Sequence, residues 1–233
     1  MTLGTIARLW RYPVKSVGGE ECERLELDAR GVAGDRRYAI LRDGRIGSGK
    51  TTRRFRQVDG LLGLKAAYRA DIPEIILQDG SRVLGTDPNV HAGLSNALGL
   101  SVTLAREDAV PHLDAGPVHL ITTAALAWLR AALPDSQIDE RRFRPNLVIE
   151  APGAVQVEQE WIGKILAIGD RVRLRVADPT ERCRMVTLAQ PGLPPDPRVL
   201  ASIIRDADSG FGVYAEVVVP GAIARGDCCR LAP

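Results

Sequence analysis

The sequence contains few cysteines, no long apolar run and almost no net charge. Its cysteines form no C-x-x-C pair, which excludes the usual zinc and iron–sulfur spacings and makes a poor disulfide framework. No segment approaches the ~18 apolar residues of a membrane span, and the first residues lack the apolar core of a signal peptide. A formal net charge of +2 gives no basis for nucleic-acid binding. We therefore expect a cytoplasmic protein with no membrane span and no nucleic-acid partner. The four cysteines are Cys22, Cys183, Cys228 and Cys229.

Short strand patterns bounded by Gly, Pro or Asp-Gly recur along the whole chain. They lie at residues 5–12, 22–27, 36–41, 64–68, 75–78, 101–105, 118–121, 145–150, 171–176, 183–188, 212–219 and 228–231. Helical periodicity appears only at 89–98, at 196–207 and after Thr122 and Thr123 as far as Pro134. The sequence thus predicts a mainly β (α+β) protein with a β-barrel and about three short peripheral helices. Pro, Gly and acidic residues at 107–117 indicate a boundary between two regions.

Residues 44–51 match the P-loop pattern G-x-x-x-x-G-K-[ST]. A phosphate-binding loop of this kind requires a helix after the lysine, packed on a parallel sheet. Asp43-Gly44 is instead a hairpin turn signal, and residues 51–58 have too little apolar character for a buried helix. We therefore expect a turn between antiparallel strands and keep nucleotide binding as a remote alternative.

Four polar clusters lie at or next to predicted strand ends, where the backbone can direct side chains into a common pocket. If the clusters converge, the pocket is cationic, carries Ser and Asn hydrogen-bonding groups and contains one thiol. Such a pocket suits a phosphorylated anion that also carries a soft metal. The clusters are residues 12–16, 34–37, 141–146 and 181–184.

Cys183 is the candidate functional thiol, because Arg182 and Arg184 flank it. Nearby positive charge favours the thiolate, which is the form that binds soft metals and attacks sulfur. The alternative is an inert core cysteine. The clustered arginines have an alternative too, as solvated rim charges paired with neighbouring acids. This second alternative applies to Arg36, Arg37, Arg141 and Arg142, with Asp35, Asp139 and Glu140 as partners.

Seven motifs occur in a characteristic order: YPVKS, GVAGDRRY, TTRR, RRFRPNLVIE, EWIGKILAIGDRVRL, RCRMVTL and FGVYAEVVVPGAIARGD. In them the chain resembles, over essentially its whole length, the molybdenum-cofactor-sulfurase C-terminal domain (MOSC) proteins with an N-terminal β-barrel region. It is similar to the amidoxime-reducing members of that family. The resemblance implies a β-barrel-like N-terminal region at residues 1–110 and a MOSC domain at residues 111–233.

The resemblance also implies a cofactor, the molybdenum cofactor (molybdopterin), whose pterin ends in a phosphate and whose dithiolene holds the metal. Cys183 matches the cysteine that ligates molybdenum, and so it is both the catalytic and the metal-binding candidate. Pyridoxal phosphate binding is a further association of the family. The positions that match cofactor-binding residues are Lys15, Ser16, Arg36, Arg144, Asn146 and Tyr214, with Thr122 and Thr123 as further members of the same shell.

The implied reaction is oxygen removal from a small N-hydroxylated or N-oxygenated substrate at the metal, with no side chain acting as a nucleophile. The chain has neither the length nor the cysteines for a fused ferredoxin-like module, so we expect an external electron-transfer protein. An alternative is a sulfur carrier that receives a persulfide on Cys183 from a sulfur donor. The sequence departs from the reductases after Cys183, where RMVTLAQPGLPPDP replaces a Thr-Thr-Val-Asp-Pro-like stretch.

Overall fold

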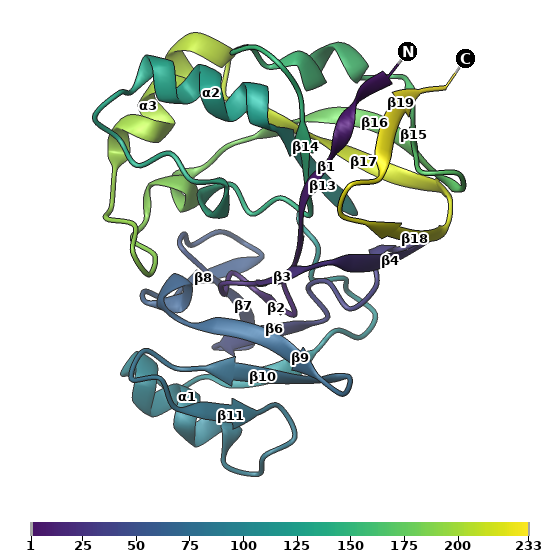
Figure 1. Ribbon diagram of the computed structural model, residues 1–233. Coiled ribbons are helices and arrows are strands. Elements are labelled where there is room, and N and C mark those ends of the chain that lie inside the picture. Colours follow the sequence, from purple (N-terminus) through teal and green to yellow (C-terminus); the bar gives the residue numbers. More distant parts are fainter. Residues whose placement is uncertain (1, 233) are drawn as a thin grey trace.

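The computed structural model describes residues 2–232, and its centre is a closed barrel of seven strands (Figure 1). The strands follow one another around the barrel in the order β14-β13-β17-β16-β15-β19-β1, and pairing of β1 with β14 closes the ring. All neighbours are antiparallel except β13 and β14. The strands are β1 (Thr2–Arg11), β13 (Val118–Thr122), β14 (Leu147–Glu150), β15 (Ile165–Ile168), β16 (Val172–Glu181), β17 (Gly210–Val219) and β19 (Cys228–Leu231).

The first strand closes a barrel that is otherwise built from the second half of the chain. Thr5 of β1 pairs with Glu150 on one side and with Cys228 on the other. A Cβ atom on Gly4 would lie 1.7 Å from the carbonyl oxygen of Glu150, so this close approach of two strands requires glycine. The predicted boundary near residue 110 therefore separates β1 from its barrel partners along the sequence, and the division into domains stays a prediction.

The remaining strands form three smaller sheets next to the barrel, and most of them lie in the lower part of Figure 1. A five-stranded sheet contains β2, β6, β7, β8 and β12, and a three-stranded sheet contains β9, β10 and β11. A third sheet joins β4 and β5 to β18, while β3 extends the edge of β1. The bounds are β2 (Val14–Lys15), β3 (Glu20–Cys22), β4 (Arg24–Asp28), β5 (Gly31–Val32), β6 (Tyr38–Arg42), β7 (Arg45–Ser48), β8 (Phe55–Gln57), β9 (Lys65–Arg69), β10 (Ile72–Ile76), β11 (Arg82–Leu84), β12 (Thr103–Arg106) and β18 (Gly221–Ala224).

Three α-helices occur where the sequence predicts them, because their end signals are local. The Thr122 hydroxyl accepts a hydrogen bond from Ala125 N at the start of α2, and Asp196 caps α3 before a proline. Gly99 ends α1 in the left-handed conformation. The α-helices are α1 (Val90–Leu98), α2 (Thr123–Ala132) and α3 (Pro197–Ala207), and the short 3₁₀ helices are η1 (Leu61–Gly63), η2 (Glu140–Arg142), η3 (Val157–Trp161) and η4 (Arg184–Thr187).

Three apolar cores hold these layers together. One fills the barrel around the buried Trp161, as expected for a small barrel packed with side chains. A second lies between the N-terminal sheets and α1, around Leu64 and Leu94. The third attaches α2 and α3 to the outside of the barrel through Phe143 and Phe211, whose ring centroids are 4.3 Å apart.

The mainly β fold with three helices is confirmed, and so is the hairpin at Asp43-Gly44, which joins the antiparallel strands β6 and β7. The strand expected at residues 183–188 is wrong. Cys183 is extended, but the next residues form η4, closed by a hydrogen bond from Val186 N to Cys183 O. Strand pairing stops because β16 separates from β17 after the Glu181–Gly210 pair, leaving no partner for residues 183–188. Across residues 2–232, no helix has the length and apolar character needed to cross a membrane.

Candidate functional site

A partly open cavity of about 130 Å³ lies where the barrel meets the five-stranded sheet. Both halves of the chain contribute to its wall, including Lys15 from β2, Tyr214 from β17 and the residues around η4. We call it the anion cavity. Six of the predicted site residues line it: Lys15, Ser16, Arg36, Arg144, Cys183 and Tyr214.

Three of these residues have left-handed backbone conformations that L-amino acids seldom adopt. The φ angles are 61° at Ser16, 50° at Arg36 and 55° at Arg144. Each such conformation costs on the order of 1 kcal/mol, and residues of this kind cluster at functional sites. Backbone strain at these three residues therefore accompanies the placement of their side chains at one cavity. The rest of the fold offsets the free energy that this strain costs.

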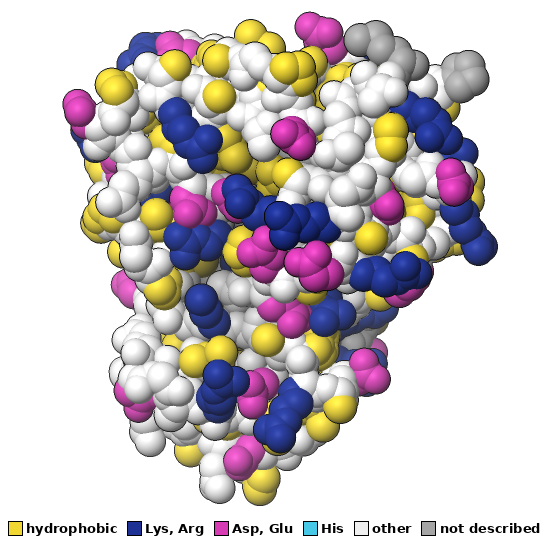
Figure 2. Space-filling model, in the orientation of Figure 1, with side chains coloured by type: hydrophobic (Ala, Val, Ile, Leu, Met, Phe, Trp, Pro, Cys, Tyr) yellow, Lys and Arg dark blue, Asp and Glu magenta, His cyan; other side chains and the backbone are white. Residues whose placement is uncertain are grey.

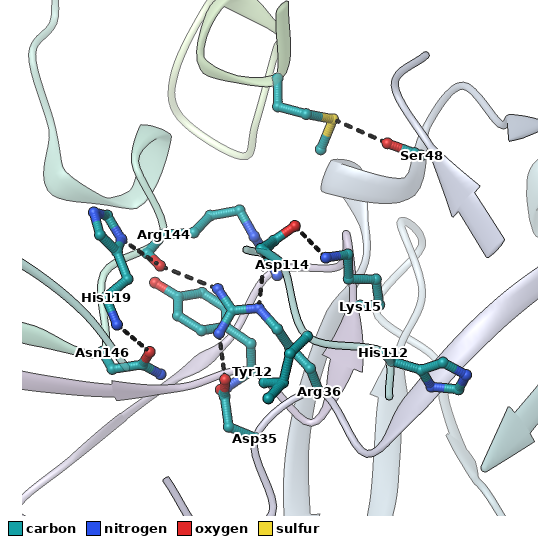
Figure 3. A network of polar contacts seen from close by, with 12 residues as sticks. Tyr12, Lys15, Asp35, Arg36, Ser48, His112, Asp114, His119, Arg144 and Asn146 are labelled. Carbon is teal, nitrogen blue, oxygen red and sulfur yellow. Dashed lines mark hydrogen bonds and ion pairs between the residues drawn. The ribbon is translucent and has the colours of Figure 1, made fainter. Parts of the chain in front are cut away.

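Asp114 is the anionic partner of the cavity cations. Its carboxylate accepts a hydrogen bond from Lys15 Nζ and lies 3.3 Å from Arg36 Nε (Figure 3). Burial lowers the pKa of Lys15 to about 8, although the charge of Asp114 opposes that shift. The two cations depress the pKa of the partly exposed Asp114 carboxyl, so it is ionised at neutral pH. A carboxylate of the protein thus occupies the position where a bound anion would meet Lys15 and Arg36.

A second network fixes the two arginines against Tyr12. Asp35 is fully buried, pairs with Arg36 Nη1 and accepts a hydrogen bond from Tyr12 N at 2.8 Å. Arg36 Nη2 in turn donates to the carbonyl oxygen of Arg144 at 3.3 Å. The guanidinium carbons of Arg144 and Arg36 lie 4.2 Å and 5.0 Å from the centre of the Tyr12 ring (Figure 3). These contacts hold both cations before any ligand arrives.

Cys183 is half-buried in the cavity wall and is the extended residue directly before η4. The arginines beside it do not form the pair expected from the sequence. Arg184 is exposed, whereas the Arg182 guanidinium turns into the protein and donates to the carbonyl oxygens of Phe211 and Phe143. Arg182 also meets Nε2 of His119 and forms no salt bridge within residues 2–232. The cavity therefore has a half-buried cation whose hydrogen-bond acceptors are all neutral.

His119 is neutral and holds Arg182 in place. Burial and the charge of Arg182 lower the pKa of His119 well below its usual value. Its Nδ1 lies 3.3 Å from the carbonyl oxygen of Arg144. Because a carbonyl can only accept, Nδ1 carries the proton and Nε2 accepts from Arg182. Tyr214 lies beside the imidazole, with ring centroids 5.6 Å apart.

Three of the predicted site residues do not line the anion cavity. Thr122 is buried, caps α2 and donates to Glu158 Oε2 at 2.7 Å. The hydroxyl of Thr123 donates to the carbonyl oxygen of Ala151. Asn146 is also buried: its Oδ1 accepts from His119 N (Figure 3). The Asn146 amide nitrogen donates to the Trp10 carbonyl oxygen. Thr122 and Asn146 thus support the strands that carry the cavity residues.

The other clustered arginines divide between the two expected roles. Arg37 pairs with Glu107, and Arg141 pairs with Asp139, as rim charges would. Arg142 lines the cavity but is buried, and it donates to backbone carbonyl oxygens. On the face shown in Figure 2, cationic and anionic side chains gather in the belt between the barrel and the lower sheets.

Several cavity residues belong neither to the predicted site residues nor to the four polar clusters: Ser48, Lys50, Asp114, His119 and Met185. Ser48 and Lys50 belong to the rejected P-loop match, and they reach the cavity from the end of β7 without any following helix. Gly49 N lies 3.1 Å from the Met185 sulfur and links that turn to η4. The sequence gives one indication of Asp114: it lies in the segment 107–117, whose Pro, Gly and acidic residues mark a loop between two regions.

The donor set of the cavity fits an anionic, metal-bearing cofactor. Within residues 2–232, no group of three His, Cys, Asp or Glu side chains could hold a metal ion alone. The cavity instead combines one thiol with buried cations, of which Arg144 keeps Nη2 without a hydrogen-bond partner in the described chain. A soft metal that arrives bound to an organic ligand needs only one thiolate from the protein. A phosphate group on that organic ligand would bind the cations of the cavity.

Comparison with known proteins identifies the family. A model described as "MOSC domain" matches residues 88–230, and one described as "MOSC N-terminal beta barrel domain" matches residues 3–69. The chain belongs to the MOSC domain family. The molybdenum-cofactor-related function of this family agrees with the fold and with the donor set of the cavity.

Individual relatives are distant. The chain is 25% identical over 235 residues to mitochondrial amidoxime-reducing component 1 of Mus musculus. The match covers 80% of this chain and 66% of the mouse protein, so the chain spans just under two-thirds of the length of that relative. The crystal structure of the YUAD protein from Bacillus subtilis matches with a TM-score of 0.56 at 14% identity, over 98% of this chain and 94% of that one. The crystal structure of YiiM from Escherichia coli matches with a TM-score of 0.37 at 13% identity, over 51% of this chain and 55% of the YiiM chain. The YUAD likeness supports the fold alone.

Proposed function

We propose that this MOSC protein binds the molybdenum cofactor in the anion cavity and is an oxidoreductase for N-hydroxylated or related N-oxygenated compounds. One observation carries the proposal: Cys183 lies in the same cavity wall as the buried cations Lys15, Arg36 and Arg144. A thiol and buried cations in one cavity suit a ligand that carries both a soft metal and negative charge. The distant similarity to an amidoxime-reducing component supports the same class of substrate.

In this proposal the chain's own residues bind and orient. Lys15 and Arg36 hold the phosphate, with Ser16 as a hydroxyl donor beside them, and Arg144 holds the pterin end. Cys183 supplies the thiolate ligand to the metal. Burial raises the pKa of Tyr214, so its phenol keeps the proton and can donate a hydrogen bond into the cavity at neutral pH.

The bound cofactor would supply the redox chemistry. For an N-hydroxylated substrate this means that two electrons and two protons cleave the N–O bond, leave N–H on the product and release the oxygen as water. The protein contributes position and electrostatics. The described residues contain no cluster of cysteines for an iron–sulfur group. We therefore propose that a separate electron-transfer protein delivers the electrons.

Metal and pterin analysis of protein from a molybdopterin-producing host tests the proposal. Wild type should carry molybdenum and pterin in near-equal amounts, and Cys183→Ala should lose the metal while it keeps part of the pterin. Cys22→Ala is the matched control, because Cys22 is also a half-buried free thiol but lies on β3, outside the cavity wall. Wild-type protein that folds yet carries neither molybdenum nor pterin would overturn the assignment.

A sulfur carrier is the second candidate, since Cys183 lines an open cavity and is free. It would accept a sulfane sulfur from a cysteine desulfurase and pass it to a metal centre. Incubation with desulfurase and cysteine, followed by mass spectrometry, separates the two functions. One added sulfur on Cys183 in cofactor-free protein favours the carrier, and a Cys183→Ala variant that retains reductase activity would refute the metal-ligand role.

A further inference from the structure

The turn between β7 and β8 carries cations that the proposed cofactor site does not use. Lys50, Arg53 and Arg54 lie on this turn, and Arg184 lies at the start of η4. All four side chains are exposed, and none of them forms a salt bridge within residues 2–232. We call them the rim cations. Lys50 belongs to the rejected P-loop match, so this part of the sequence still lacks a role.

The rim cations lie at the opening of the anion cavity. Lys50 lines that cavity, and Gly49 N lies 3.1 Å from the sulfur of Met185, which joins the turn to η4. The guanidinium carbon of Arg54 lies 5.3 Å from the ring centre of Phe55, another residue of the cavity wall. A partner that bound the rim cations would therefore cover the opening of the anion cavity.

Hydrogen bonds hold the turn in one conformation before any partner binds. Thr52 N donates to the carbonyl oxygen of Phe55 at 3.0 Å, and the Thr52 hydroxyl accepts from the backbone N–H groups of Arg54 and Phe55. The Arg54 side chain donates to the carbonyl oxygens of Pro111 and Leu113, so it also fixes the segment that faces the turn. Groups that are already ordered lose less conformational entropy on association.

An exposed apolar side chain lies next to these charges. Val110 is 64% exposed, compared with 55% for Val155. It directly precedes Pro111, whose carbonyl oxygen is bound by Arg54. Protein interfaces combine apolar contact with a polar rim, whereas nucleic-acid sites need a longer basic track, with aromatic rings where single strands bind. The surface therefore suits contact with another protein.

The charge balance at the rim favours an acidic partner. The segments that meet there carry two exposed carboxylates, Glu181 and Asp108, which also form no salt bridge within the described residues. Four cations against two carboxylates leave two positive charges. The cavity wall behind them does not cancel this surplus, because the carboxylates of Asp114 and Asp35 are outnumbered by further cations. Those cations are Lys15, Arg36, Arg142, Arg144 and Arg182. A cofactor phosphate in the cavity would reduce the inner surplus and leave the rim cations free for a partner.

We infer that the rim cations and Val110 form the docking surface for a small protein with an acidic face. Complementary charge orients that partner during the encounter, and the contact area can be small, as in transient redox complexes. The role of the partner rests on the proposed function: an acidic electron-transfer protein bound here lies against the cavity that contains Cys183. Two successive one-electron transfers supply the two electrons for N–O cleavage, and the redox group of the partner is oxidised in each.

Titration of the ¹⁵N-labelled, cofactor-free full chain with plant-type ferredoxin, a small acidic redox protein, tests the inference. At an ionic strength of about 0.02 M, where surface charges are weakly screened, ferredoxin should shift or broaden the amide signals of residues 50–54, 108–114 and 184 in a saturable manner. Raising the ionic strength to about 0.2 M should weaken this binding. Cytochrome c, a basic redox protein of similar size, should produce no saturable change.

Charge reversal at single positions locates the surface. Arg53→Glu and Arg184→Glu change exposed side chains that form no hydrogen bond or salt bridge within residues 2–232, so the fold should persist. Each should weaken ferredoxin binding by about tenfold at low salt, because reversal changes the local charge by two units. Arg171→Glu is the matched control, since Arg171 is also exposed and lies just before β16, about 30 Å along the strand from Glu181.

Loss of affinity in both rim variants, with full binding in Arg171→Glu, supports the inference. It is overturned if ferredoxin does not bind, if binding survives both rim reversals, or if Arg171→Glu weakens it as much. Tighter binding of cytochrome c or of a single-stranded DNA oligonucleotide would also exclude an acidic protein as the partner. None of these measurements needs molybdenum, so the docking surface can fail while metal analysis supports the cofactor site, and the reverse.

Discussion

Asp114→Asn should tighten the binding of a small dianion in the anion cavity, because it removes the carboxylate that already pairs with Lys15 and Arg36. A full charge about 4 Å from a bound anion is worth about 4 kcal/mol at an effective dielectric constant of 20. The Asp114 side chain is 42% exposed, so solvent screening reduces this value. We expect about 1.4 kcal/mol, which is about a tenfold gain in affinity.

Sulfate is a suitable ligand for this measurement, since its charge is constant between pH 6 and 9, and calorimetry on cofactor-free protein gives the affinity. The titration belongs at pH 6, because removing Asp114 also removes a charge that keeps Lys15 protonated. Asp108→Asn is the matched control: it makes the same change on the same segment, on an exposed side chain outside the cavity wall. Unchanged or weaker sulfate binding in Asp114→Asn would refute the reasoning that this carboxylate competes with the anion.

Two further predictions concern pH. Burial lowers the pKa of Lys15 to about 8, so sulfate affinity should fall as pH rises through 8 and Lys15 loses its charge. Arginine stays charged over this range, so Lys15→Arg should flatten the pH profile of sulfate affinity between pH 7 and 9. A wild-type affinity that does not change over this range would contradict this role of Lys15. Burial raises the pKa of Glu158 from 4.5 to about 7, so its contribution to stability is fully present below pH 4.5 and is lost as pH rises through 7. Glu158→Gln should therefore be about 3 kcal/mol more stable than wild type to urea at pH 8 and close to it in stability below pH 4.5, and a difference that does not depend on pH would exclude this cause.

The sequence predicts those parts of the fold whose signals are local. The caps at Thr122 and Asp196 and the Asp43-Gly44 turn each depend on neighbouring residues, and all appear where expected. The strand at residues 183–188 fails because its alternating pattern says nothing about whether a partner strand continues beside it. The pairing of β1 with β19 is equally invisible in a sequence taken alone.

The same distinction holds for the site. Cationic clusters next to Gly and Pro indicate which residues can reach a pocket, and Lys15, Arg36 and Arg144 do meet in one. Asp114 and His119 belong to no such cluster, and only the fold brings them to the same cavity. Asn146 lies two residues from Arg144, yet it serves the backbone. The left-handed conformation of Arg144 interrupts the extended chain, so the rule that residues two apart in a strand share one face does not apply here.

The position of β1 has a consequence for the order in which the protein can be completed. It is the first barrel strand to be synthesised, but its neighbours end at Glu150 and Leu231. One edge therefore waits for β14, and the other stays unpaired until β19 has been made. Contacts this far apart in sequence make folding slow, and an open barrel exposes strand edges that can pair with other chains. A polypeptide interrupted anywhere before β19 therefore keeps an open seam between β1 and β15, and premature termination is more harmful to this barrel than its small effect on length suggests.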